Sequence, residues 1–349
     1  MRRCSKHATC RPVVNQPLPT RVLELSPTSR HKLIETRGLF GQYVILSHCW
    51  GSSDNMYKTT KDKLPALQQQ LDTGALSRNF QDAILFTQRL GFKYLWIDAL
   101  CIVQDDPADW EKEASSMGDY YNRSALMLSA AAAPDHASGF LHHRPQGLSP
   151  SFGTDRWFYV RPQILQEYAL DLMPISKRAW TMQERYLAPR VIHFLPDQVF
   201  FECGNSSYSE GYFKNNMAES NFFSKLRIQK YIEPDLCLAE DRKRTPNMDP
   251  APSRWLGQFH YDMWYECVRM FTSRNITFHS DRMPAIAGLA KKFSHPNAGA
   301  YLAGHWENDL FRSLCWTSTT RGRRGRSGGE SKTPQAVMKY RGPSWSWVS

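Results

Sequence analysis

The sequence predicts an α/β protein with a partly parallel sheet at its centre and a mainly helical C-terminal region. Short apolar runs rich in strand formers recur within residues 41–205. Amphipathic helical patterns separate these runs, and strands that alternate with helices are typical of βα units. After residue 205 the composition becomes polar and loop-rich before helical patterns return.

The expected strands of the central sheet are continuously apolar. They are "YVILS" (43–47), "YLWIDALCIVQ" (94–104) and "ALMLSAAAA" (125–133). Continuous apolar residues, rather than alternating ones, are typical of strands covered on both faces. The second run is expected to lead from a strand into a loop. Residues 190–203 predict a hairpin or two short strands, and residues 156–163 one further strand.

Helical patterns lie between the runs. They cover residues 79–92, 105–122 and 175–188. Gly91 ends the first pattern, and the second begins with acids and a proline, as helix starts do. In the third, Ser176 is expected to cap the helix and Pro189 to stop it.

We divide the chain into three parts. Residues 1–40 are polar and irregular and form an expected N-terminal arm, residues 41–205 form the core domain, and residues 206–349 form a Trp-rich C-terminal region. Helices are predicted in that region over 264–278, 283–293 and 301–316. The closing "PSWSWVS" (343–349) fits a strand that packs against more protein, so this region is expected to be truncated.

Composition narrows the class of protein. The net charge of +11 favours anionic partners. Part of the excess lies in "RGRRGRSGG" (321–329), which we interpret as a solvated loop, with a nucleic-acid or anionic-lipid contact as the alternative. The first residues lack the apolar core of a signal peptide, and no run of 18 apolar residues exists. We therefore expect a cytoplasmic protein with reduced thiols, no membrane span and no nucleic-acid partner.

Several motifs resemble those of fungal heterokaryon-incompatibility (HET) domain proteins. They are "YVILSHCWG", "YLWIDALCIVQDDPADWEKEASSMGDYYNRSALMLSAA", "RAWTMQER" and "PSWSWVS". The departures are mild, with His48, Ala99 and Met182 standing where tyrosine, serine and leucine are common. The resemblance implies nonself recognition that ends in cell death. HET domains are regarded as distant relatives of TIR domains, so it also implies a flavodoxin-like core.

The segment "RAWTMQER" (178–185) carries the spacing of the catalytic W-x-x-x-E segment of TIR domains that hydrolyse NAD. Trp180 and Glu184 stand at positions i and i+4 and so share a helix face. We expect Trp180 to line a pocket and Glu184 to stabilise the oxocarbenium-like transition state of glycosidic cleavage. The alternative is that Glu184 pairs with Arg178 or Arg185 while Trp180 simply packs.

Residues at the ends of the first two strands complete the candidate site. They are Ser47, Trp50 and Gly51 at the end of the first strand, and Asp98 and Cys101 at the end of the second. Ligands of open α/β sheets bind at the carboxyl ends of strands. Gly51 would let the backbone approach a phosphate, and Asp98 would hydrogen-bond a ribose. For both positions a purely structural turn is the alternative.

Other chemistries have weaker support. Cys49 beside His48 forms no dyad, because neighbours on a strand point to opposite faces. A thiol hydrolase would need Cys101 to meet a distant histidine such as His193. Glu113 is a second acid candidate, which we expect to pair with Lys112 or Arg123.

A metal site is a further alternative near the start of the chain. Cys4, His7 and Cys10 have zinc-like spacing, but no fourth ligand is near them in the sequence, so we predict no metal.

The sequence thus predicts a HET protein that triggers fungal cell death, with NAD hydrolysis at Glu184 as its candidate reaction. NAD would be a substrate, and no cofactor is required. Self-association is expected, and other signalling proteins are candidate partners. The alternative function is a non-catalytic, oligomerising signalling adaptor.

Overall fold

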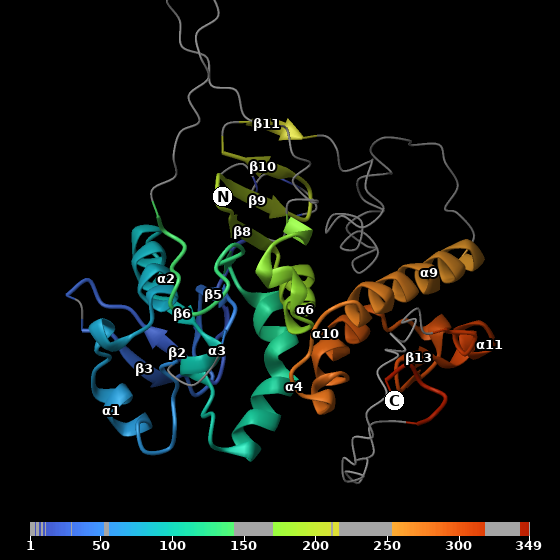
Figure 1. Ribbon diagram of the computed structural model, residues 1–349, viewed down its shortest axis with the longest axis horizontal. Helices are drawn as coiled ribbons and strands as arrows, with labels where there is room; N and C mark the ends of the chain where they lie inside the picture. Colours follow the sequence, from blue (N-terminus) through green and yellow to red (C-terminus); the bar gives the residue numbers. More distant parts are fainter. Residues whose placement is uncertain are drawn as a thin grey trace, which may run out of the picture.

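The fold is described from a computed structural model (Figure 1). It describes residues 4, 7, 10, 12–28, 30–51, 56–142, 170–210, 212–215, 253–317 and 343–348. The strand predicted over 156–163 and the Arg-rich stretch 321–329 lie outside these residues. Among the described helices, none combines the length and apolar character needed to cross a membrane.

One large mixed sheet forms the centre of the molecule. Its strands are β2 (Arg21–Glu24), β3 (Lys32–Glu35), β5 (Tyr43–Ser47), β6 (Tyr94–Trp96), β7 (Leu126–Ser129), β8 (Arg190–Phe194), β9 (Val199–Cys203), β10 (Ser207–Ser209) and β11 (Tyr212–Asn215). These nine strands are ordered β11-β10-β9-β8-β7-β5-β6-β2-β3. The sheet therefore extends past both ends of the core predicted at 41–205.

The parallel part of the sheet confirms the predicted α/β class. β5 pairs in parallel with β6 and β7, and β7 pairs in parallel with β8. If β5, β6, β7 and β8 are numbered 1 to 4 along the chain, their order in the sheet is 2-1-3-4, as in flavodoxin-like sheets. β9 then pairs with β8 in the antiparallel direction, where a flavodoxin-like sheet has its fifth parallel strand. Every residue of β5 is buried, as its continuous apolar run predicts.

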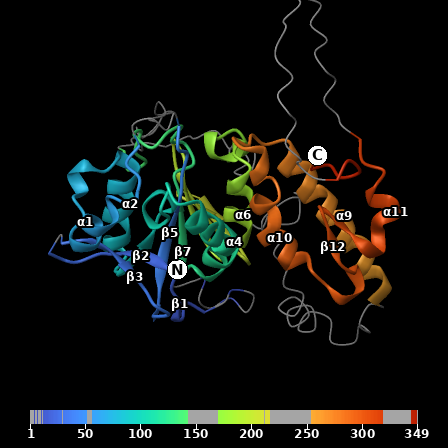
Figure 2. The same ribbon diagram turned by 90° about the horizontal axis from the view of Figure 1, so that it is seen from below.

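Helices cover both faces of the parallel strands. They are α2 (Arg78–Arg89), α4 (Pro107–Arg123) and α6 (Trp180–Leu187). Figures 1 and 2 place α2 on one face, with α4 and α6 on the other. The Asp106 side chain caps α4 by accepting from the Ala108 amide at 3.2 Å, and Pro107 occupies its first turn. The three predicted helices are therefore confirmed, with ends shifted by a few residues.

The N-terminal segment differs from the predicted irregular arm. Besides β2 and β3 it contains β1 (Gln16–Pro17) and β4 (Phe40–Gly41), which pair with each other. β2 pairs with β6 and so joins this segment to the main sheet. The sequence signal was weak because these strands are only two to four residues long.

The second predicted strand, 94–104, ends early. β6 stops at Trp96, and α3 (Asp98–Cys101) follows as a single helical turn. The Asp98 carboxylate accepts from the Ala99 amide at 2.7 Å. This local hydrogen bond favours a turn over continued strand pairing. The helix predicted over 175–188 starts late, because the 3₁₀ turn η4 (Pro174–Lys177) precedes α6. Ser176 donates to the Leu170 carbonyl at 2.6 Å instead of capping the helix.

The C-terminal region is mainly helical, as predicted. It contains α9 (Ser253–Thr272), α10 (Pro284–Phe293) and α11 (Leu310–Ser313). The helix predicted over 301–316 is wrong for its first half, where β12 (Tyr301–Leu302) and β13 (His305–Trp306) form a hairpin. Ala303 and Gly304 both have positive φ, which ends any helix there. Residues 343–348 form turns instead of the expected strand.

Candidate functional site

Ser47 and Glu184 meet at the carboxyl end of the central strand. Ser47 is the last residue of β5, and Glu184 lies in the second turn of α6. The Ser47 hydroxyl donates to Glu184 Oε2. The fold therefore brings together two predicted site residues that are 137 positions apart in the chain, at the edge where α/β sheets bind ligands.

Glu184 has the properties of an acid–base group. Its side chain is 3% exposed, and burial raises its pKa to about 7. The positive charge of Arg178 and the hydrogen bond from Ser47 act against this rise, while the negative charge of Asp98 adds to it. A carboxyl with a pKa near neutrality can accept or donate a proton at physiological pH.

Asp98 and Trp50 form a second contact beside this pair. The Trp50 indole nitrogen donates to Asp98 Oδ2 at 2.9 Å, and both side chains are half-buried. His48 Nδ1 lies 3.7 Å from Asp98 Oδ1. Burial lowers the pKa of His48 to about 4, so this imidazole is neutral at physiological pH. Asp98 thus has a partly exposed carboxylate close to the buried one of Glu184.

Arg178 links the two contacts. Its guanidinium donates to the His48 carbonyl, and its charge lowers the pKa of Glu184. It makes no ion pair with Glu184 among the residues that the structure describes. Arg185, the other expected partner, instead binds both carboxylate oxygens of Glu202, at 2.8 and 2.9 Å. The ion pairing considered for Glu184 from the sequence is therefore absent from this described region.

Trp180 and Glu184 contact different neighbours. The Trp180 indole nitrogen donates at 3.4 Å to Asp281 Oδ2, in the 3₁₀ turn η6 (His279–Asp281) of the C-terminal region. Trp180 is half-buried, whereas Glu184, one helical turn further on, is directed at Ser47. The contacts of Trp180 therefore join α6 to the C-terminal region.

Gly51 and Cys101 have structural environments. Gly51 has a φ of +71°, and a Cβ atom there would lie 2.5 Å from Asp135 Cβ, so only glycine fits this turn. Cys101 is fully buried in the core, where burial raises the pKa of its thiol to about 12. Among the described residues the structure brings Ser47, Trp50, Asp98 and Glu184 together and leaves the Cys101 thiol inside the core.

The other candidate groups have partners of their own. His193 Nε2 lies 3.0 Å from Glu202 Oε1, and no described contact joins it to Cys101. Burial also raises the pKa of Cys49, which disfavours its thiolate. Glu113 is fully buried and accepts from the Tyr120 hydroxyl at 2.9 Å, instead of pairing with Lys112 or Arg123. These contacts therefore do not support a thiol hydrolase.

Two residues near Glu184 were not identified from the sequence. The Tyr121 hydroxyl donates to the Leu46 carbonyl at 3.4 Å and its proximity helps to lower the pKa of Glu184, but in the sequence this tyrosine belongs to the apolar stripe of its helix. Arg274 donates to the Arg178 carbonyl at 3.3 Å and to Thr181 Oγ1 at 3.2 Å. Arg274 is 96 positions from Arg178 and had no motif to identify it.

The fold and these contacts define an α/β domain whose parallel strands end at a buried carboxyl of near-neutral pKa. Residues 43–184 match the family model described as heterokaryon incompatibility protein (HET), and we call this matched segment the HET domain. A HET domain implies a role in heterokaryon incompatibility. The match begins at the first residue of β5 and ends at Glu184, so it spans every predicted site residue. Searches of curated proteins and of solved structures gave no match.

Proposed function

We propose that this HET domain promotes fungal cell death by hydrolysing NAD at the bond between nicotinamide and ribose. One observation carries the proposal: a carboxyl with a pKa of about 7, held by Ser47 at the carboxyl ends of the parallel strands. The W-x-x-x-E spacing of Trp180 and Glu184 supports the same reaction through the resemblance to TIR domains.

The reaction needs a single carboxylate. The bond between ribose C1′ and the pyridinium nitrogen breaks, and its electron pair leaves with neutral nicotinamide. A water oxygen then bonds to C1′, and its proton passes to Glu184, which gives ADP-ribose. With a pKa of about 7, roughly half of the Glu184 side chains are ionised at pH 7 and can stabilise the positive charge on the sugar.

Neighbouring groups fit the other parts of the substrate. We expect the partly exposed Asp98 carboxylate to accept from ribose hydroxyls and the positive charge of Arg178 to attract the pyrophosphate. Because Glu184 is only 3% exposed, the loops at the strand ends must open before a ribose reaches it. We propose that self-association of the domain drives this opening.

A non-catalytic signalling adaptor is the second candidate function. The same burial of Glu184 favours it, together with the bond from Trp180 to Asp281. In this case the Ser47–Glu184 contact would only fasten α6 to β5, and the domain would act by assembling with partners.

Nicotinamide release from NAD distinguishes the two functions. We expect the concentrated wild-type protein to release nicotinamide and Glu184→Gln to release it at least about 100-fold more slowly, the usual effect of losing an acid–base group. Glu113→Gln is the matched control, because it removes another buried carboxyl that contacts Tyr120. We expect this variant to keep the wild-type rate.

No release by either folded protein, even when it is assembled, would favour the adaptor. Equal release by wild type and Glu184→Gln would contradict catalysis by Glu184. Circular dichroism would establish that each variant is folded. In fungal cells, toxicity that persists in Glu184→Gln would also contradict the enzymatic function.

A further inference from the structure

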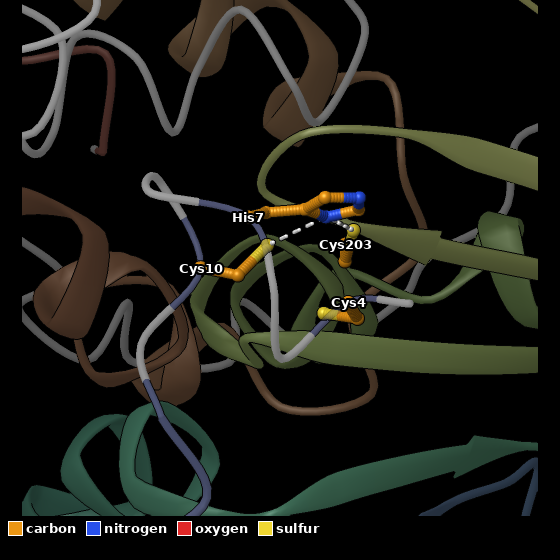
Figure 3. Close-up of side chains that lie close together, drawn as sticks. All are labelled: Cys4, His7, Cys10 and Cys203. Atoms are coloured by element: carbon orange, nitrogen blue, oxygen red, sulfur yellow. Dashed lines mark hydrogen bonds between the residues drawn. The ribbon is translucent and has the colours of Figure 1, made fainter. Parts of the chain in front are cut away.

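Four metal-binding side chains gather away from the Glu184 site. Cys4, His7 and Cys10 come from the N-terminal segment, and Cys203 is the last residue of β9. Figure 3 shows the three sulfur atoms and the His7 ring directed toward a common centre. Their ligand atoms all lie within 4.8 Å of one another. Cys203 is the fourth ligand that the sequence did not reveal, because 196 positions separate it from His7.

The backbone of the N-terminal segment forms this arrangement. The His7 amide donates to the Cys4 carbonyl at 3.1 Å, and the Cys10 amide donates to the His7 carbonyl at 3.2 Å. Each of these two bonds joins residues three positions apart, which is the period that brings side chains to one side in a 3₁₀ helix. Because the cysteines and the histidine recur every three residues, the sequence itself encodes this grouping.

The distances match a tetrahedral ion. His7 Nδ1 lies 3.5 Å from Cys10 Sγ and 3.7 Å from Cys203 Sγ. With Zn–S bonds of about 2.3 Å and Zn–N bonds of about 2.0–2.1 Å, the N-to-S edge of a tetrahedron is about 3.6 Å. Cys4, Cys10 and Cys203 are all free thiols, and each is at least nine-tenths buried.

The surrounding charge also suits a metal. Three thiolates and one Zn²⁺ carry a net charge of −1, which needs a buried counter-charge. Arg190 supplies it: its side chain is buried, and its Nε donates to Cys4 Sγ at 3.2 Å. A guanidinium in this position both neutralises the cluster and orients one ligand.

We infer that Cys4, His7, Cys10 and Cys203 bind one zinc ion. Four protein ligands fill its coordination sphere, so the site is structural and not catalytic. The ion would fasten the N-terminal segment to the end of β9. The same segment continues into β2, and four strands, β8, β7, β5 and β6, lie between β9 and β2 in the sheet. Zinc would therefore fix the N-terminal segment in its position across the sheet, between the end of β9 and the start of β2.

Metal content tests the inference. The full chain, purified without an affinity tag or chelator, should contain about one zinc per molecule. Cys203→Ser and His7→Ala should each lose it, whereas His7→Cys should keep it, because four cysteines also form a zinc site. Cys315→Ser is the matched control, since Cys315 is an exposed thiol outside the cluster. It should keep the wild-type zinc content.

A spectroscopic measurement covers variants that fold poorly. Wild-type protein stripped of metal and titrated with Co²⁺ should show the visible bands of tetrahedral cobalt and thiolate-to-cobalt charge transfer. Prior alkylation of its thiols should abolish the charge-transfer band. Any of three results would overturn the inference: folded wild type without zinc, equal zinc in wild type and Cys203→Ser, or a disulfide among Cys4, Cys10 and Cys203 in freshly purified protein.

Discussion

At the scale of single residues, Glu184 and His48 show how burial sets the charge of the site. Burial raises the pKa of Glu184 to about 7 and lowers that of His48 to about 4. In both cases the neutral form is favoured because the charged form loses its hydration. The two groups consequently affect stability in opposite directions over the acidic range.

Replacing Glu184 by glutamine should stabilise the protein above neutral pH. The folded-state pKa of Glu184 lies above its ordinary value of 4.5, so wild type loses stability as pH rises from about 4.5 to about 7. Glu184→Gln lacks this loss. The free energy of unfolding of the variant minus that of wild type should grow by about 3 kcal/mol between pH 4.5 and pH 8.

Urea unfolding of both proteins at a series of pH values measures this difference. Titration of other groups, including His48, cancels when the two curves are subtracted. A difference that stays flat with pH would mean that the pKa of the Glu184 carboxyl in the folded protein is the same as its ordinary value of 4.5.

The sequence predicted several residues of this candidate site but not their contacts. Ser47, Asp98 and Glu184 stand in recognisable motifs, so their positions at strand ends and on a helix followed from local pattern. Arg178 stands in the same motif as Glu184, but Arg274, which donates to the Arg178 carbonyl, comes from a segment 96 positions away that only the fold brings near. The same limit applied to Cys203, which meets His7 only after β9 has joined the sheet.

At the scale of elements, α4, α6 and α10 pack around two glycines. A Cβ atom on Gly118 of α4 would lie 2.9 Å from the Gly288 Cα of α10. The Gly288 amide donates at 2.6 Å to Gln183 Oε1, which comes from the "RAWTMQER" segment of α6. The HET domain and the C-terminal region therefore meet where two helix backbones come into direct contact.

Gly288→Ala should destabilise the protein, although alanine usually favours helices. A Cβ atom at this position would lie 2.6 Å from Gln183 Oε1 and 2.9 Å from Leu187 Cδ1. Overpacking of this kind costs about 1–3 kcal/mol, which exceeds the gain of about 1 kcal/mol in helix propensity. Thermal and urea unfolding measure the change.

Ser115→Ala, at an exposed position of α4, is the control and should change stability by no more than about 0.5 kcal/mol. A Gly288→Ala variant more stable than wild type would show that the helices separate without cost.

Element predictions succeeded where patterns were long and failed where they were short. The helices α2, α4 and α10 follow their apolar periodicity closely. In contrast, the helix predicted over 301–316 is wrong at the β12–β13 hairpin. Its two-residue strands are too short to show alternating apolar and polar residues, and the residue type of Ala303 does not indicate its positive φ.

At the scale of the whole molecule, residues 343–348 return to the helical region. Trp347 is buried and donates from its indole nitrogen to the Gly304 carbonyl at 3.2 Å. Arg282 Nη1 donates to the Val348 carbonyl at 3.0 Å, and Figure 1 marks the C-terminus beside β13. A Cβ atom on Gly304 would lie within 2.8 Å of three atoms of the Trp347 indole.

Trp347→Ala and Trp345→Ala should therefore differ. Trp347 is 8% exposed and Trp345 is 44% exposed, although only one serine separates them. Loss of the buried indole should lower the free energy of unfolding by about 3–5 kcal/mol, and loss of the exposed one by about 1 kcal/mol or less. Far-ultraviolet circular dichroism on heating compares the two variants. Equal effects would contradict the packing of Trp347 against Gly304.

The strands that flank β5, β6 and β7 on either side bear on how fragments of this protein behave. The matched segment 43–184 contains neither β2, which covers one edge of β6, nor β8, which covers one edge of β7. A polypeptide cut to that segment would leave the amides and carbonyls of both strands without their ladder partners, an arrangement that invites aggregation. A fragment that keeps both of these ladder partners therefore starts before Arg21 and continues beyond Phe194.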